Sequence, residues 1–502
     1  MKNRIKQYLL AASMCVGLTA CSDFFEPIPG VQFGLDETFA SKQRTEEYLN
    51  NVYSYVREVT DAIHPNTYGG IFTEASLDGA NRWNKTYAEW TNGSFNSASA
   101  QASEYFSKYY QAIAKASTFI QNVDKCTEAA ASTRGKWKSE ARALRAYYYF
   151  ELLRLYGPIP LIGEDPIPLD ASLEELIKER NSVDECVNFI ATELQSAIDS
   201  GDLLQRAGKA NLGRMDVATC MALKAKLYLY WASPLFNGNT DQASVKNKDG
   251  KQLFPQTEDN SKWTQARDAY ERFMTFATGQ GYKLTEVYTN GKLDPYASCR
   301  AAGEFFTTTW EAVDELIFVK LRDLYDYTYW VCPKFTDFQD TDVTGGGGYY
   351  TTQETVDLFF TKDGLTIEED PGYDKFEGIP GANNFTSGRY YDPNNPSRLY
   401  FDADKSKVLK QWKDREPRFY VNITYSGSIW LNEGKYNEEM RTDFTNGANG
   451  TCGKSKASGD CPDSGYLIRR GAKASNNNGS KHFSPVLRLA DMYLGYAEAL
   501  CM

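Results

Sequence analysis

Few residues of this 502-residue chain are suited to acid–base or nucleophilic chemistry. Only two histidines occur, His64 and His482, so a histidine-based triad and a multi-histidine metal site are nearly excluded. The glycine run TGGGG at 344–348 is not a phosphate-binding loop, because no Lys-Ser/Thr pair follows it and no strand–helix frame surrounds it. We therefore expect no cofactor and no metal.

The cysteines give a second chemical signal. No CxxC pair exists, which argues against a structural zinc site. Cys452 and Cys461 flank a loop rich in Gly, Ser and Lys and could form a disulfide in an oxidising compartment. Three others lie inside helical patterns and are expected to be small buried groups: Cys126, Cys186 and Cys220.

The N-terminus reads as a targeting segment. A positive region with Lys2, Arg4 and Lys6 precedes the apolar stretch YLLAASMCVGL, which is too short to span a bilayer as a mature helix. The following LTAC resembles a lipoprotein signal, in which Cys21 is acylated and becomes the first mature residue. We predict a signal peptide over 1–20 and a lipidated tether over 21–36; the alternative is an ordinary signal peptide with a chance cysteine.

Composition and charge narrow the classes of partner. The formal net charge is −11, which argues against nucleic acid because phosphate binding needs basic surfaces. No later segment has the uninterrupted apolar length of a membrane span. Aromatic residues make up 14% of the chain, with 34 tyrosines, so their placement matters for function.

One predicted helix carries aromatics on all sides. Trp137, Leu144, Tyr148 and Leu155 share one face at helical spacing, and Gly157-Pro158 should end the helix. Within it, residues 147–150 are four consecutive aromatics, which surround the axis because successive helical residues point about 100° apart. We expect this helix to be stacked between neighbours, with these aromatics in the core.

Further helical patterns occur on both sides of a long central region. Ser182 and Glu185 form a capping box, Asp216 caps the next helix, and another covers about 263–278. Ser484 as N-cap and Pro485 at the first position predict the start of the last helix. Paired helices with small residues suggest tetratricopeptide-like units.

These patterns divide the chain. We predict a mainly α-helical fold: a helical-repeat region over 37–280, a loop-rich region with short strands over 281–481, and the start of a final helical pair over 482–502. Residues 61–100 form a long loop inside the first region, and loops of that length are commonly functional. The run RFYVNITYSGSIW alternates in part and predicts a strand.

Five blocks of this sequence resemble the SusD/RagB family of outer-membrane nutrient-binding lipoproteins. They run in family order and are CSDFFEP, SEARALRAYYYFELLRLYGPIPLI, GRMDVATCMALKAKLYLYWASPLFNG, REPRFYVNITYSG and VLRLADMYLGYAEAL. The resemblance implies a non-enzymatic lipoprotein on the outer face of the outer membrane. It also implies a helical-repeat scaffold that caps a SusC-like TonB-dependent transporter and captures oligosaccharides, or sometimes peptides.

In that family, loop aromatics contact the ligand, since sugar rings stack on aromatic faces while their hydroxyls need polar partners. The resemblance carries this role over by region rather than by a fixed motif. The candidate carbohydrate-binding residues are Asp78, Asn81, Arg82, Trp83, Trp90, Tyr296, Tyr327, Trp330 and Tyr350.

Other interpretations stay open. The chain stops at YAEALCM, where the family continues with further helical sequence, so we expect a truncated product or a fragment. A glycoside hydrolase would need two carboxylates around the scissile bond, and no motif among the 66 Asp and Glu places such a pair. A peptide-capturing or purely scaffolding helical-repeat lipoprotein of the same transporter complex is the other alternative.

Overall fold

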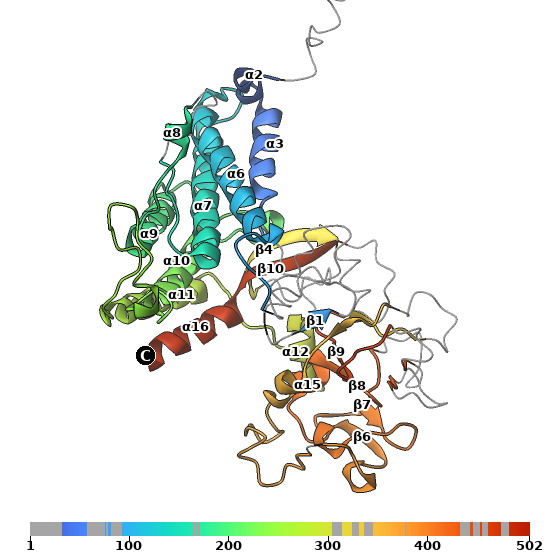
Figure 1. Ribbon diagram of the computed structural model, residues 1–502. Coiled ribbons are helices and arrows are strands. Elements are labelled where there is room, and N and C mark those ends of the chain that lie inside the picture. The colour runs from blue at the N-terminus through green and yellow to red at the C-terminus, as the bar shows by residue number, and fades with distance from the viewer. Residues whose placement is uncertain are drawn as a thin grey trace, which may run out of the picture.

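The computed structural model describes most of the chain in separate ranges. These are residues 33–57, 76, 79–81, 93–163, 167, 171–303, 314–323, 331–335, 345–376, 378–431, 442–444, 452–453, 460–472 and 481–502. Within them, long helices gather in one half of the molecule, and short strands and short helices in the other (Figure 1). No helix in this part of the chain has both the length and the apolar character needed to cross a membrane.

The helical half is a series of neighbouring helices packed on one another. Its helices are α2 (Leu35–Ala40), α3 (Lys42–Tyr53), α6 (Ala100–Asn122), α7 (Ala131–Tyr156), α8 (Leu173–Leu176), α9 (Val183–Asp199), α10 (Val217–Ala232), α11 (Ser261–Gly279) and α16 (Leu489–Cys501). Helix α6 packs on α7, α7 on α9, α9 on α10, and α10 on α11; the distant α16 then packs on α11 and α10. Short 3₁₀ turns η1 (Val123–Lys125), η2 (Lys209–Asn211) and η3 (Thr240–Gln242) lie between them.

Helix α7 lies at the centre of this half, which explains its four consecutive aromatics. Tyr148 stacks on Tyr109 of α6 with ring centroids 5.9 Å apart, and its hydroxyl donates to the Val52 carbonyl of α3. Tyr149 meets Phe189 of α9. The remaining two contact a strand and another helix: Tyr147 with Phe318, and Phe150 with Tyr230 of α10. All four are buried, so the core prediction is confirmed.

The predicted helix signals are confirmed at three ends. Ser182 and Glu185 bond reciprocally at the start of α9, and the Asp216 side chain accepts from the Thr219 N–H at the start of α10. Gly157 ends α7 with φ of 70°, a conformation that favours glycine. Local chemistry therefore set these boundaries.

The start of the last helix was predicted wrongly. Ser484 and Pro485 lie in strand β10 (Lys481–Arg488), which pairs antiparallel with β4 (Leu316–Asp323), and α16 begins only at Leu489. The register shifts directly after Pro485, so the residue that lacks an N–H lies at an irregularity of the ladder. Pairing with a strand about 165 residues earlier overrides the local cap signal.

The second half of the molecule is built from short elements. Its strands are β1 (Ala80–Asn81), β2 (Tyr288–Thr289), β3 (Lys292–Leu293), β5 (Tyr349–Tyr350), β6 (Arg389–Asp392), β7 (Asn395–Asp402), β8 (Ile423–Tyr425) and β9 (Tyr466–Ile468). Its helices are α12 (Pro295–Gly303), α14 (Gln353–Asp357) and α15 (Pro417–Asn422), with 3₁₀ turns η5 (Ala382–Asn384) and η6 (Lys410–Trp412). The strands predicted in this region are present, but the run RFYVNITYSGSIW is helical through Asn422 and extended only from Ile423.

Candidate functional site

A four-stranded sheet brings together segments that are far apart in the sequence. Its strand order is β1-β5-β9-β8, and every neighbouring pair is antiparallel. Ala80 pairs with Tyr350, and Tyr350 pairs with Leu467. Residues 80–81 are therefore paired with the late loop-rich region, where the family resemblance expects a ligand.

Two predicted site residues lie at this junction. Asn81 ends β1, beside Tyr349 and Tyr350 of β5. Tyr349 is buried in an apolar cluster with Val331 and Trp430, whereas Tyr350 is half-buried. Because successive residues of a strand face opposite sides, Tyr350 faces away from that cluster. The structure thus places residue 81 in the strand next to β5, where it pairs with Tyr349, whereas Tyr350 pairs with Ala80.

The other candidates fall in two groups. Tyr296 is described and lies elsewhere, in α12. The remaining candidates lie outside the described residues, and their role stays a prediction: Asp78, Arg82, Trp83, Trp90, Tyr327 and Trp330.

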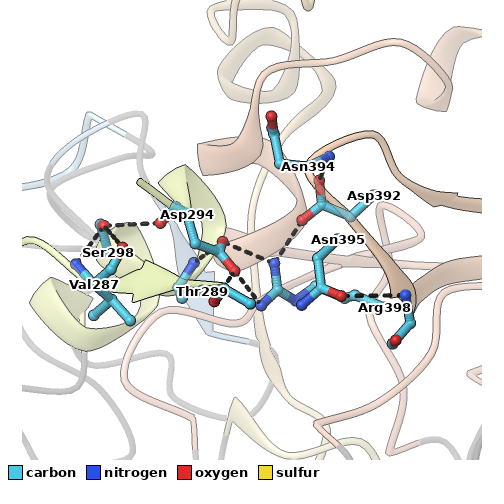
Figure 2. A network of polar contacts seen from close by, with 10 residues as sticks. Val287, Thr289, Asp294, Ser298, Asp392, Asn394, Asn395 and Arg398 are labelled. Carbon is cyan, nitrogen blue, oxygen red and sulfur yellow. Dashed lines mark hydrogen bonds and ion pairs between the residues drawn. The ribbon is translucent and has the colours of Figure 1, made fainter. Parts of the chain in front are cut away.

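Tyr296 contacts Arg398, which is the centre of the buried ionic clamp that Figure 2 shows. The guanidinium of Arg398 in β7 donates to both oxygens of Asp294, at 2.9 Å each, and to Asp392 of β6 at 2.5 Å. Asp294 also accepts from the Ala297 N–H of α12 and from the Thr289 hydroxyl of β2. The clamp therefore fixes α12 and the β2–β3 hairpin onto the β6–β7 hairpin.

One guanidinium serves two carboxylates in this clamp. Burial acts to raise the pKa of Asp294, but the hydrogen bonds from Arg398, Ala297 and Thr289 outweigh it and lower the pKa to about 2. Asp294 and Asp392 are both almost completely buried. Asp294 therefore stays ionised near neutral pH, and both carboxylates are bound to one guanidinium.

The Tyr296 ring is packed rather than open. The Arg398 guanidinium lies 4.2 Å from its centroid, and Tyr400 approaches at 5.6 Å. Tyr400 in turn stacks on Tyr420 with centroids 3.9 Å apart. The sequence analysis missed this aromatic cluster, although its members Tyr400 and Tyr420 lie in the aromatic motifs RLYF and RFY. A ligand contact of Tyr296 stays a prediction.

The two cysteines proposed as a disulfide are both buried. Cys452 belongs to the apolar cluster around Trp430, and Cys461 is 5% exposed. Cys332 is a third thiol in this region: burial raises its pKa, and Cys452 adds to the shift. The Cys452–Cys461 disulfide stays a prediction, with Cys332 as a competing partner. Among the described residues, no group of three or more His, Cys, Asp or Glu could hold a metal ion.

Comparison with known proteins places the fold in a class. The model of the SusD family matches residues 315–502, and a second model, described as starch-binding associating with outer membrane, matches residues 32–229. Together they span most of the chain. The protein has the SusD-like, tetratricopeptide-like helical fold, and the chain belongs to the SusD/RagB family.

Several individual proteins share this similarity. A SusD-like protein of Bacteroides ovatus is 27% identical over 175 residues, which are 34% of this chain and 30% of that relative. A solved structure named BT4246 matches with a TM-score of 0.70 and 23% identity, over 91% of this chain and 78% of its own. A SusD-like protein from Bacteroides fragilis matches with a TM-score of 0.65 and 21% identity, over 93% of this chain and 77% of its own.

Two further solved structures share the fold, and the names of these proteins mention a glycan. One is a laminarin binding SusD-like protein, with a TM-score of 0.50 and 17% identity over 92% of this chain and 80% of its own. The other is surface glycan-binding protein A from Bacteroides uniformis, with a TM-score of 0.51 and 13% identity over 91% of this chain and 76% of its own. At these identities the likeness is one of fold.

Proposed function

We propose that this protein is a non-catalytic glycan-binding lipoprotein of the cell surface. It is anchored in the outer membrane through acylated Cys21, faces the exterior, and passes captured oligosaccharides to a SusC-like TonB-dependent transporter. The observation that carries the proposal is the family match at both ends of the chain, one part of which is described as starch-binding. The glycan-binding names of two proteins with this fold support it.

The ligand lies at the junction of β1 and β5. In this proposal Trp83 and Trp90, which follow β1 in the sequence, supply aromatic faces, and Asp78, Asn81 and Arg82 supply polar partners. Tyr327 and Trp330, which follow β4 in the sequence, are the further aromatic candidates. The apolar face of a sugar ring then stacks on an aromatic side chain, and its hydroxyl groups form hydrogen bonds at the same site, as sugar binding requires. The β1–β5 pairing supports this assignment because it places Ala80, a near neighbour of these residues in the sequence, opposite Tyr350.

The clamp argues against a hydrolase at the carboxylate pair Asp294 and Asp392. A glycosidase needs one protonated and one ionised carboxyl group around the scissile bond. Asp294 and Asp392 instead share Arg398, and the pKa of Asp294 is lowered to about 2. These two carboxylates join the segment before α12 to the β6–β7 hairpin through Arg398 and are not available to a substrate.

The helical half offers the surface for the transporter. A cavity of about 480 Å³ between α6 and α8 is lined mostly by apolar residues, among them Tyr110, Ile113 and Ile162. Around it Phe106, Leu176 and Ile177 are exposed, Ile177 by 68%. Exposed apolar patches of this kind are typical of protein interfaces, so the helices hold the transporter while the loops hold the glycan.

Alanine variants of the loop tryptophans test the ligand site. We expect Trp83→Ala and Trp330→Ala each to weaken polysaccharide binding at least about tenfold, roughly 1.4 kcal/mol, in calorimetric titration. Tyr493→Ala is the matched control, because Tyr493 is an exposed aromatic on α16. If both tryptophan variants kept the affinity of the unmodified protein, the assigned loops would be wrong. Binding of peptides in place of glycans would favour the peptide-capturing alternative.

A further inference from the structure

A second cavity in the strand-rich half is built from both aromatic and polar residues. It has a volume of about 590 Å³, within the roughly 300–1,000 Å³ of small-molecule sites. Its lining comes from α14, the segment 375–380, η6 and the start of β9. These segments differ from those of the predicted loop site.

Gln411 is a buried polar group in this lining with an unused amide. The residue is 7% exposed. Its main-chain carbonyl accepts from the Tyr373 hydroxyl, but its side-chain amide makes no hydrogen bond to any residue that the structure describes. The amide is not among the fully buried polar atoms that lack a partner in the described residues, so it is accessible from the cavity, and a ligand with a donor and an acceptor can bond to it there.

A chain of hydrogen bonds connects the floor of this cavity to its rim. Trp412 Nε1 donates to the Tyr466 hydroxyl, at 3.0 Å, and that hydroxyl donates to Gln353 Oε1, at 2.6 Å. Gln353 Nε2 then donates to Asp357 Oδ1. Burial raises the pKa of Tyr466 to about 12, so the phenol stays a neutral donor and the chain keeps this direction. Asp357 Oδ2 makes no hydrogen bond to the described residues and remains an acceptor.

Phe376 supplies an apolar face at the same cavity. Its ring is half-buried and lines the cavity, and it forms no ring pair with another described aromatic. Lys375 and Asp357 bring opposite charges to the lining, so the cavity has no strong preference for an ionic ligand. A flat apolar face, an amide and a carboxylate together match a neutral ring that carries several hydroxyls.

We propose that this cavity is a second saccharide subsite, which binds one end of a neutral glycan held at the β1–β5 junction or a separate short oligosaccharide. The sugar stacks on Phe376 and exchanges hydrogen bonds with the Gln411 amide and the Asp357 carboxylate. This inference rests on the proposed function, since it names a further place at which the same class of ligand binds.

The test uses short probes on variants that lack the loop tryptophans. Maltotriose, laminaritriose and cellotriose are titrated by calorimetry into the Trp83→Ala/Trp330→Ala protein, with and without Phe376→Ala. We expect the double variant to retain binding of at least one trisaccharide, and Phe376→Ala to weaken it at least tenfold. Ile379→Ala is the matched control: Ile379 is 95% exposed on the same segment and does not line the cavity.

Asp357→Asn gives a second readout that leaves the shape of the cavity unchanged. We expect it to weaken the same binding at least threefold, with an unchanged thermal unfolding midpoint. If Phe376→Ala and Asp357→Asn bound the probes as tightly as Ile379→Ala, or if the double variant bound no trisaccharide while the unmodified chain bound polysaccharide, the second subsite would be refuted. If the unmodified chain bound no saccharide at all, the proposed function would fail with it.

Discussion

Arg145 of α7 is a fully buried cation whose charge is matched within the helical half. Its guanidinium donates to Glu193 of α9, at 2.9 Å from Nε, and to the Ser117 hydroxyl of α6, at 3.1 Å. One side chain therefore joins three helices. Arg142 contacts the same glutamate at 3.0 Å, but its side chain is 24% exposed.

This difference in burial predicts different costs of removal. We expect Arg145→Met to lower the free energy of unfolding by about 3–5 kcal/mol, because it leaves the Glu193 carboxylate buried with one partner fewer. Arg142→Met is the matched control and should cost about 1 kcal/mol or less. Urea unfolding of both variants measures the loss of unfolding free energy. Equal losses would show that burial does not determine how much each ion pair stabilises the fold.

The clamp on Asp294 predicts a pH dependence at the same scale. The pKa of this carboxyl is about 2 in the folded protein and about 3.9 in an unfolded chain. Its stabilisation is therefore fully present above about pH 4 and is lost as the pH falls through 2. We expect Asp294→Asn to lower stability at pH 7 and to flatten the loss between pH 4 and pH 2. Asp241→Asn, at an exposed turn, is the control and should leave the slope unchanged in urea unfolding.

At the scale of elements, the packing of α16 on α11 depends on one glycine. A Cβ at Gly495 would lie 2.2 Å from the Tyr270 hydroxyl oxygen, and Tyr270 is 1% exposed. In an open helix, Gly→Ala stabilises by roughly 0.5–1 kcal/mol. Here we expect Gly495→Ala to destabilise by about 1–3 kcal/mol, as overpacking does.

The partner of that contact provides the control for Gly495. Combining Gly495→Ala with Tyr270→Phe, which removes the clashing oxygen, should recover part of the loss in thermal unfolding. A Gly495→Ala protein more stable than the original would contradict the close packing of α16 on α11.

The elements differ in how far the sequence predicts them. Helices α7, α9, α10 and α11 follow from apolar periodicity and from caps such as Ser182 and Asp216, because both signals are local. The strand at Ser484 was missed since it depends on pairing with Lys320, far away in the chain. The candidate site is similar: aromatic loops could be named, but the meeting of β1 with β5 and the second cavity at Gln411 arise from non-local packing.

At the scale of the whole molecule, the two halves suit two tasks. The helical half buries its aromatics around α7 and exposes apolar side chains such as Ile177. The other half is built from short strands and short helices (Figure 1). The strand β10 leads directly into α16 and links the second half back to the first.

The central claim is binding without cleavage, and one measurement tests it directly. Residues 22–502, without the lipid, are titrated by calorimetry against a panel of polysaccharides, and the same samples are assayed for new reducing ends. We predict saturable binding of at least one neutral polysaccharide with no increase in reducing ends. Release of reducing ends would contradict the account and redirect attention to a carboxylate pair, and a folded protein that bound no glycan would contradict glycan capture itself.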